Sequence, residues 1–297
     1  MRRKVVVMKL ITLIFSVLLS CTAMLMAQGL DTAKLDEAMD RSGQKTGDVY
    51  RLSFPRTDLH VSVAGVEIKA GLALGSWAAF AGSDSEAMVM GDLVLLENEL
   101  TPVMKKLRAA GFDITAVHNH VLNETPRVIY MHYMGHGKAV ALAKSLRAAL
   151  AESNTPLDKP APPTAATEPP AFVKTIEDTV GTKGRFAGGV LSFGIPRAGA
   201  ITDHEMTLTT PQGVAEAINF QEAGTGKVAT TEDFVLTAEE VNPVISALEE
   251  HDIAVTALHS HMLTEQPRLF FMHFWAVGTT ESVAAGIKAA LSHVAVK

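Results

Sequence analysis

Two short segments of the chain carry residue types suited to metal chemistry, and they carry them in the same order. Each segment has a His-x-His-x-x-x-Glu pattern with a third histidine eight residues after the glutamate. The residues are His118, His120, Glu124 and His132 in the first segment, and His259, His261, Glu265 and His273 in the second. Imidazole and carboxylate groups are ligands that zinc, iron, manganese and copper take in proteins. The pattern therefore predicts a divalent transition-metal site in each segment.

A β-hairpin would bring the residues of each segment together. Side chains alternate along a strand, so the two histidines and the glutamate of the pattern project from one face. We predict that the β-rich runs 114–122 and 128–134 form a hairpin that turns at 125–127, which places His120 across from His132. Three imidazoles and one carboxylate would then converge on one face of the hairpin.

Two alternatives use the same residues. Neutral imidazole is a general base near neutral pH, so each cluster also fits a polar-substrate or acid/base site that needs no metal. Histidines on half-buried strands can instead be structural residues that only form hydrogen bonds. Metal binding is the leading hypothesis, because three histidines and one glutamate are predicted on one face in two copies.

Four further residues have a predicted role at the site. Arg127 and Arg268 follow a proline at each predicted turn, where a planar guanidinium group can bind an anionic ligand; an exposed turn arginine is the alternative. Asp92 and Asp233 lie in otherwise apolar runs, and we predict that each orients a metal-bound imidazole through a hydrogen bond. Their alternative role is in a turn or a helix cap.

The chain contains an internal duplication. Each residue of the first cluster recurs 141 positions later, since 259 − 118 = 141 and 273 − 132 = 141. The same offset aligns Pro55-Arg56 with Pro196-Arg197, and Asp92 with Asp233. The segment 152–171 is rich in proline and small polar residues, which favour an extended linker. We therefore predict a first repeat module at 30–151, a linker at 152–171 and a second repeat module at 172–297.

The periodicity of apolar residues predicts the same α+β fold for both modules, a mainly antiparallel sheet with packing helices. Each module is expected to follow the order α-β-β-β-α-β-β-α. The expected elements of the first module are a helix near 35–41, strands at 49–54, 77–80 and 87–96, a helix at 100–107, the hairpin, and a helix at 139–150.

The N-terminal segment 1–27 has the pattern of an export signal. Four basic residues within the first nine precede an apolar run at 10–19, which is too short to cross a bilayer comfortably. Leu-Leu-Ser-Cys at 18–21 resembles the lipobox of bacterial lipoproteins, and Cys21 is the one cysteine of the chain. We predict export to the periplasm or the cell envelope, with a lipid on Cys21 as the membrane anchor.

The formal net charge of −6 argues against nucleic acid as a partner. Binding to phosphates needs clustered cations, and no Lys/Arg run follows the first nine residues.

Two resemblances bear on function. The spacing of His118, His120 and Glu124 is similar to the first metal motif of cupins, but the long helices between the strands limit this to an analogy of ligands. Over nearly the whole mature length the chain resembles the LppY/LpqO-type lipoproteins, on the stretches 90–95, 116–120 and 124–127 and their second copies. That resemblance implies a secreted or lipid-anchored protein with a duplicated domain and no established reaction.

The expected function is therefore that of an exported, lipid-anchored protein that binds a divalent metal or a small polar ligand through the histidine clusters. Two other functions remain open. The protein could be a metal-dependent hydrolase or isomerase, since a metal with an open position polarises substrates or activates water. It could also be a structural envelope protein whose histidines are not ligands. The sequence does not indicate an oligomeric state.

Overall fold

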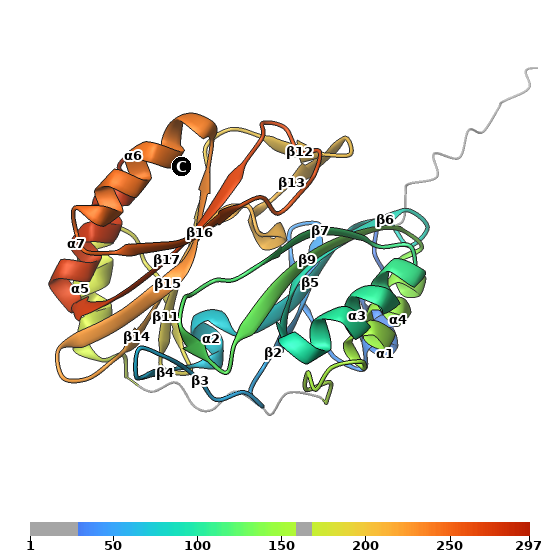
Figure 1. The fold of residues 1–297 in the computed structure, drawn as a ribbon. Helices are drawn as coiled ribbons and strands as arrows, with labels where there is room; N and C mark the ends of the chain where they lie inside the picture. The colour runs from blue at the N-terminus through green and yellow to red at the C-terminus, as the bar shows by residue number, and fades with distance from the viewer. Residues whose placement is uncertain (1–28, 159–167) are drawn as a thin grey trace, which may run out of the picture.

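The computed structural model describes residues 29–158 and 168–297, which form two modules of one architecture (Figure 1). The elements of the first module are α1 (Thr32–Met39), β1 (Gln44–Thr46), β2 (Val49–Pro55), β3 (Val61–Val63), β4 (Val66–Ile68), α2 (Ala70–Ala73), β5 (Gly75–Gly82), β6 (Ala87–Leu96), α3 (Glu97–Ala109), β7 (Asp113–His118), β8 (Glu124–Thr125), β9 (Val128–Gly137) and α4 (Ala139–Leu150).

The second module repeats this order with small changes. Its elements are α5 (Ala171–Val180), β10 (Arg185–Ala187), β11 (Val190–Pro196), β12 (Ile201–Asp203), β13 (Met206–Leu208), the 3-10 turn η1 (Thr210–Gln212), β14 (Ala215–Glu222), β15 (Lys227–Leu236), α6 (Ala238–Glu249), β16 (Ala254–His259), β17 (Phe270–Thr279) and α7 (Thr280–Leu291). The predicted fold class, two tandem α+β repeats with antiparallel sheets, is confirmed.

Each module has one six-stranded sheet in which neighbouring strands are antiparallel. The strand orders are β1-β2-β5-β6-β9-β7 and β10-β11-β14-β15-β17-β16. The local sequence patterns located the main elements well, and β6 and α4 have the predicted bounds. The short β3–β4 and β12–β13 hairpins were not anticipated, because three-residue strands leave almost no periodicity to recognise.

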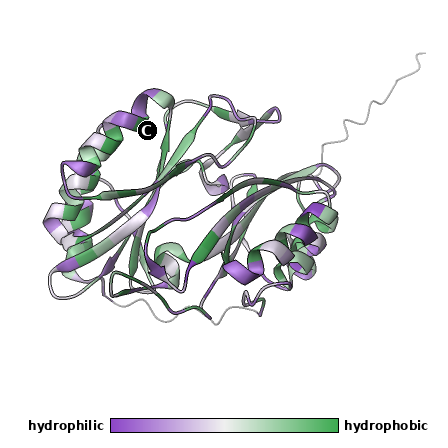
Figure 2. Cartoon of the chain, in the orientation of Figure 1, coloured by the Kyte–Doolittle hydropathy of each residue, from purple (hydrophilic) through white to green (hydrophobic). Residues whose placement is uncertain are grey.

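The longer helices cover the outer face of each sheet, whereas the one-turn helix α2 packs between the sheets against β14 and β15. α1, α3 and α4 lie on the first sheet and α5, α6 and α7 on the second, so the layers run helix, sheet, sheet, helix (Figure 1). Leu35, Leu107 and Leu146 bury one side of their helices against the sheet at 0% exposure. Figure 2 shows hydrophilic and hydrophobic residues alternating along these helices, as expected of helices with one buried face.

The inner faces of the two sheets face each other, and each module sends a hairpin across to its neighbour. Val61 and Ile68 of the β3–β4 hairpin belong to one buried cluster with Val190 of the second module. In return, Ile201 of the β12–β13 hairpin belongs to a buried cluster with Met88 of the first module. The two repeats are therefore related by an approximate twofold axis and share core between them.

Side-chain amides of the second repeat form hydrogen bonds with backbone groups of the first repeat. Gln221 accepts from the Lys69 amide at 2.8 Å and donates to the Glu67 carbonyl at 2.8 Å. Asn219 donates to the Leu72 carbonyl at 2.8 Å. The inner faces are thus held in register by bonds to backbone groups that would otherwise be buried without partners.

Within the described ranges no helix is long and apolar enough to cross a membrane. The predicted signal segment and Cys21 lie outside the described residues.

Candidate metal centre

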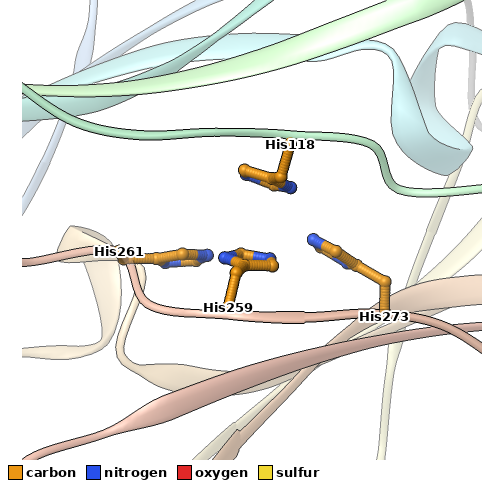
Figure 3. Close-up of side chains that lie close together, drawn as sticks. All are labelled: His118, His259, His261 and His273. Carbon is orange, nitrogen blue, oxygen red and sulfur yellow. The ribbon is translucent and has the colours of Figure 1, made fainter.

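Six histidines meet where the inner faces of the two sheets approach each other. The rings stack in three pairs across the boundary between repeats, and Figure 3 shows four of them directed toward one another. The pairs are His118 with His259 at a centroid distance of 3.6 Å, His120 with His273 at 3.7 Å, and His132 with His261 at 3.7 Å. The two clusters of the sequence are therefore halves of one cluster.

The predicted register of the hairpin is wrong, although β7 and β9 do pair. Ala116 lies across from His132, and His118 lies across from Tyr130, because the connection from the end of β7 to the start of β9 is longer than the predicted turn. A bulge between Ile114 and Ala116 changes the pairing by only one residue. Strand β7 ends at His118, so His120 lies beyond the ladder. His120 reaches the cluster from the following loop, where its ring stacks on Tyr130 at 3.4 Å.

Asp92 and Asp233 supply the carboxylates of the cluster. Asp92 pairs with His132 across the β6–β9 ladder, and its two oxygens lie 3.9 Å from Nε2 of His132 and 3.8 Å from Nε2 of His120. Asp233 repeats this arrangement, with an oxygen 3.1 Å from Nδ1 of His273 and another 3.7 Å from Nε2 of His261. The aspartates thus lie directly among the histidines, as close as potential ligands.

Glu124 and Glu265 lie elsewhere, which corrects the prediction that they complete the ligand sets. Glu124 belongs to β8 and pairs with Val63 of β3, away from the histidine rings. Glu265 is buried, but its oxygens accept from the Leu269 amide at 3.0 Å and from Arg268 at 3.3 Å. The strand that would have kept these glutamates in phase with the histidines ends too early.

The two turn arginines also lie away from the cluster. Arg127 is exposed, and its Nε lies 3.8 Å from Glu97. Arg268 donates to the Met262 and Leu263 carbonyls and to Ser260 Oγ within its own loop. Both side chains therefore have the exposed, local role that was the alternative to ligand binding.

Backbone carbonyls orient the imidazoles. Nδ1 of His118 lies 3.2 Å from the Asn119 carbonyl, and Nδ1 of His273 lies 3.0 Å from the Glu232 carbonyl. A carbonyl can only accept, so these Nδ1 atoms carry the proton and Nε2 of each neutral ring has a free lone pair. This arrangement is the usual one around a histidine that ligates a metal through Nε2.

Several buried polar atoms of the cluster have no hydrogen-bond partner among the described residues. They are Nε2 of His118, His120, His132, His259, His261 and His273, Nδ1 of His120, and Oδ1 of Asp92 and Asp233. Leaving one buried donor or acceptor unpaired costs about 1–3 kcal/mol. So many in one place indicate a missing common partner.

Burial keeps the histidines neutral. Desolvation lowers the pKa of His118 to about 3 and that of His259 to about 4, and the neighbouring imidazole adds to the effect at His118. The pKa values of the other four rings are also well below their usual value, mainly because of desolvation. Desolvation also raises the pKa of Asp92 to about 7 and that of Asp233 well above its usual range. Neutral imidazole is the form that binds metals.

Two donor groups satisfy the distance requirement of a metal site. In each group, every residue offers a ligand atom within 4.8 Å of the others. The groups are His118, His259, His261 and His273, and Asp92, His118 and His132. His118 belongs to both groups, and the first group combines residues of both repeats.

A cavity of about 710 Å³ opens onto the cluster between the two sheets. Asp92, His120, His132, Asp233 and His261 form part of its lining. Other parts come from α2, β2 and β5 of the first repeat and from η1 and β14 of the second. A small molecule therefore has room beside the histidines.

The cavity also contains residues that the sequence reasoning missed. Arg51, Trp77 and Glu232 line it. Glu232 has a φ of 130°, a left-handed conformation that costs a non-glycine residue strain, and Gly91 occupies the matching place in the first repeat. In the alignment of the two repeats, Glu232 replaces Gly91 next to the aspartate, and this replacement could have identified Glu232 as a site residue.

Comparison with known proteins identifies the repeats but no activity. Residues 33–152 and 174–293 each match the family described as Domain of Unknown Function (DUF1259). No curated protein matches the chain.

Two solved structures were found, both with very weak likeness. A trimeric bacterial microcompartment shell protein, PduB, is 10% identical with a TM-score of 0.20, over 85% of this chain and 89% of its own. EtuB from Clostridium kluyveri is 10% identical with a TM-score of 0.19, over 84% and 90%. TM-scores this low carry no argument about fold or function.

Proposed function

The chain belongs to the family described as Domain of Unknown Function (DUF1259), a description that assigns no activity. From the site, we propose that the protein binds divalent transition-metal ions at one centre that both repeats build. The observation that carries this proposal is the convergence of six neutral imidazoles, whose Nε2 atoms have no partner among the described residues.

The donor set fits a metal of borderline softness. Imidazole nitrogens with carboxylate oxygens suit zinc, iron, manganese and copper, and thiolates are absent from the described residues. Six histidines and two aspartates exceed the four to six ligands of a single ion, so the centre has donors for two. The approximate twofold axis between the repeats supplies two equivalent halves for them.

The alternative of structural histidines has less support. Structural histidines in a core use both ring nitrogens in hydrogen bonds, whereas here Nε2 of each ring is buried without a partner among the described residues. The ligand atoms of four of the rings also lie within 4.8 Å of one another, where their lone pairs repel. A bound cation between them would remove this repulsion and satisfy the lone pairs together.

The cavity favours an active centre over a closed storage site. A structural or storage metal is enclosed by its ligands, whereas a catalytic metal keeps a position open to a substrate. Five of the candidate ligands line the 710 Å³ cavity. A metal held here would polarise a bound ligand or activate water, which supports a metal-dependent hydrolase or isomerase as the activity.

We also propose that the protein is exported and lipid-anchored at Cys21, as in the LppY/LpqO-type lipoproteins that it resembles. The support is the basic and apolar N-terminal segment with Leu-Leu-Ser-Cys at 18–21. Mass spectrometry of the mature N-terminus tests this: a diacylated Cys21 is expected, and an intact Met1 in membrane-free extract would exclude export.

Metal content tests the proposed centre. Protein dialysed against mixed divalent metals and then against buffer is expected to retain one to two ions per chain by elemental analysis. The double variant His118→Ala/His259→Ala, which removes the central stacked pair, is expected to retain less than a tenth of that. His60→Ala is the matched control, because His60 is exposed and contacts only Glu67.

Stability gives a second measurement of the same centre. A ligand at 100 times its dissociation constant stabilises a folded protein by about 2.7 kcal/mol. Chelation with EDTA should therefore lower the melting temperature of the wild type by roughly 5–10 °C and that of the double variant by much less. Wild-type protein that retains no metal and does not respond to EDTA contradicts the proposal.

A further inference from the structure

The cavity breaks the symmetry that the histidine cluster keeps. Arg51 corresponds to Ser192 in the second repeat, since both strands keep the 141-residue offset (51 + 141 = 192). Trp77 pairs with Asp92, and the residue that pairs with Asp233 is Ala217. A guanidinium group stacked on an indole ring therefore stands on one wall of the cavity without an equivalent pair in the second repeat, whose own cation at the cavity is the exposed Arg185.

Arg51 is held in a fixed position in this wall. Its guanidinium carbon lies 4.0 Å above the centre of the Trp77 ring, and its Nη1 donates to the Pro211 carbonyl at 2.6 Å. The stacking and the single hydrogen bond restrict the long side chain, so a ligand that binds it loses less conformational entropy. Gly213 permits this packing, because a Cβ there would lie 3.0 Å from the Trp77 ring.

The remaining donors of Arg51 are free to bind a ligand. Among the described residues, Nε and Nη2 have no hydrogen-bond partner and no carboxylate lies within 4.0 Å of the guanidinium group. Burial lowers the pKa of Arg51 to about 10, which leaves it charged at neutral pH. A charged, planar donor that lines a cavity without a salt bridge is suited to a carboxylate or a phosphate.

The metal centre provides a further cation in the same cavity. Asp92 and His132, which form a donor group with His118, line the cavity together with Arg51. A divalent ion on this donor group offsets the charge of Asp92, and with Arg51 it presents positive charge on two sides of the space. The volume of about 710 Å³ lies within the range of small-molecule sites.

Polar groups for the rest of a ligand are also present. Thr46, Ser53 and Thr210 line the cavity, together with Asn219 and Glu232. These groups offer both hydrogen-bond donors and acceptors, which suits hydroxyl groups on the ligand. The cavity therefore offers a hydrophilic molecule polar partners, which are spaced among small apolar residues such as Ala73 and Ala217.

We infer that the metal centre binds a small oxyanion, a carboxylate or a phosphate, between the metal and the guanidinium group of Arg51. The inference rests on the proposed metal centre and adds the class of ligand that the centre receives. Arg51 is a ligand-binding residue in this assignment, and Trp77 is the residue that positions it.

Anion binding to the metal-loaded, full-length protein tests the inference. Isothermal titration with oxalate and with inorganic phosphate distinguishes the two oxyanions, and oxamide serves as the uncharged analogue of oxalate. We expect one of the anions to bind at least tenfold more tightly than oxamide. Arg51→Gln should weaken that binding by about 10–100-fold, the range expected when a charged hydrogen bond is lost, without changing the metal content.

Two further variants make the test specific. Arg51→Lys keeps the charge but loses the planar fork, so it should bind the anion with intermediate affinity even if Arg51→Gln folds poorly. Arg108→Gln is the matched control and should bind as the wild type does, because Arg108 is exposed and pairs with Asp113 at 2.8 Å outside the cavity.

The results separate this inference from the proposed function. Protein that retains no metal overturns the metal centre itself. Protein that retains its metal overturns the inference if neither anion binds better than oxamide, or if Arg51→Gln and Arg51→Lys both bind the anion with wild-type affinity.

Discussion

Replacing Asp92 by asparagine should stabilise the metal-free protein and reduce the stabilisation that added metal gives. Asp92 is 5% exposed, and its oxygens lie 3.8 and 3.9 Å from His120 and His132. In the metal-free protein the buried carboxylate is poorly solvated, whereas in the metal-loaded protein the same charge faces a cation. Asparagine has the same shape and no charge, so it separates these two effects.

The magnitude follows from the pKa of Asp92. Burial raises this pKa from 3.8 to about 7, and the folded value therefore exceeds the unfolded one. The contribution of protonated Asp92 to stability is therefore complete below about pH 4. It decreases as the pH rises to 7, because over this range the unfolded state loses its proton while the folded state keeps it. A difference of about 3 pKa units corresponds to ~4 kcal/mol at pH 8. Metal-free Asp92→Asn should be more stable than the wild type by up to this amount.

Urea unfolding of metal-free and metal-loaded protein at pH 8 and pH 6 measures both effects. The excess stability of metal-free Asp92→Asn over the wild type should be smaller at pH 6 than at pH 8. Added metal should stabilise the variant less than the wild type by about 1.4 kcal/mol or more, which is equivalent to at least a tenfold loss of metal affinity. Glu124→Gln is the control and should behave as the wild type in every condition, because Glu124 lies outside the cluster. The reasoning is refuted if Asp92→Asn destabilises the metal-free protein at pH 8 and leaves metal binding unchanged.

Three other measurements test the structure. The free energy of unfolding of Glu216→Gln, relative to the wild type, should increase by about 3–5 kcal/mol between pH 5 and pH 9 in urea unfolding. Burial raises the pKa of Glu216 to about 8, so the wild type loses the stabilising protonated form as the pH rises through that value. A difference that is constant with pH would contradict this. Gly91→Ala should destabilise the protein by ~3 kcal/mol or more in the same assay, because its Cβ would lie 2.1 Å from the Trp77 carbonyl oxygen. Gly75→Ala is the control and should not destabilise, because nothing lies within 4 Å of its Cβ. Equal stabilities of the two variants would show the packing around Gly91 to be wrong. The pKa values of about 3 and 4 at His118 and His259 lie below the unfolded value of 6.5, so the metal-free protein should lose stability as the pH falls from about 6.5 toward 3. In an acid titration followed by circular dichroism, His118→Ala/His259→Ala should therefore unfold at a lower pH than the wild type. An unchanged midpoint would argue against buried neutral histidines.

The fold of each repeat could be predicted from the sequence because its main elements depend on local patterns. Residues 87–96 are apolar apart from Gly91 and Asp92, and 139–150 has an apolar face with helical spacing, so both elements were located to the residue. The duplication was visible for a similar reason, since a constant offset of 141 residues needs no knowledge of packing. The β3–β4 hairpin was missed because three-residue strands show almost no periodicity, and the pairing of β3 with β8 joins residues about 60 positions apart.

The ligand set could be predicted only in part. Alternation along a strand correctly grouped the histidines, but it included Glu124 because the pattern does not show that β7 ends at His118. It also gave Asp92 a supporting role, since its closeness to His132 depends on which strands are neighbours in the sheet. A strand end and a choice of neighbouring strands, each decided by the surrounding packing, were enough to exchange one carboxylate for another.

The sequence by itself determined that this protein has two repeats and that each carries three histidines suited to metals. Only the tertiary structure decided that the six histidines form one centre, with His118 stacked on His259 between the sheets and Arg51 in the adjoining cavity. The physical reason is the burial of the two inner sheet faces against each other. That contact joins residues about 140 positions apart, and no local pattern in the chain encodes which faces will meet.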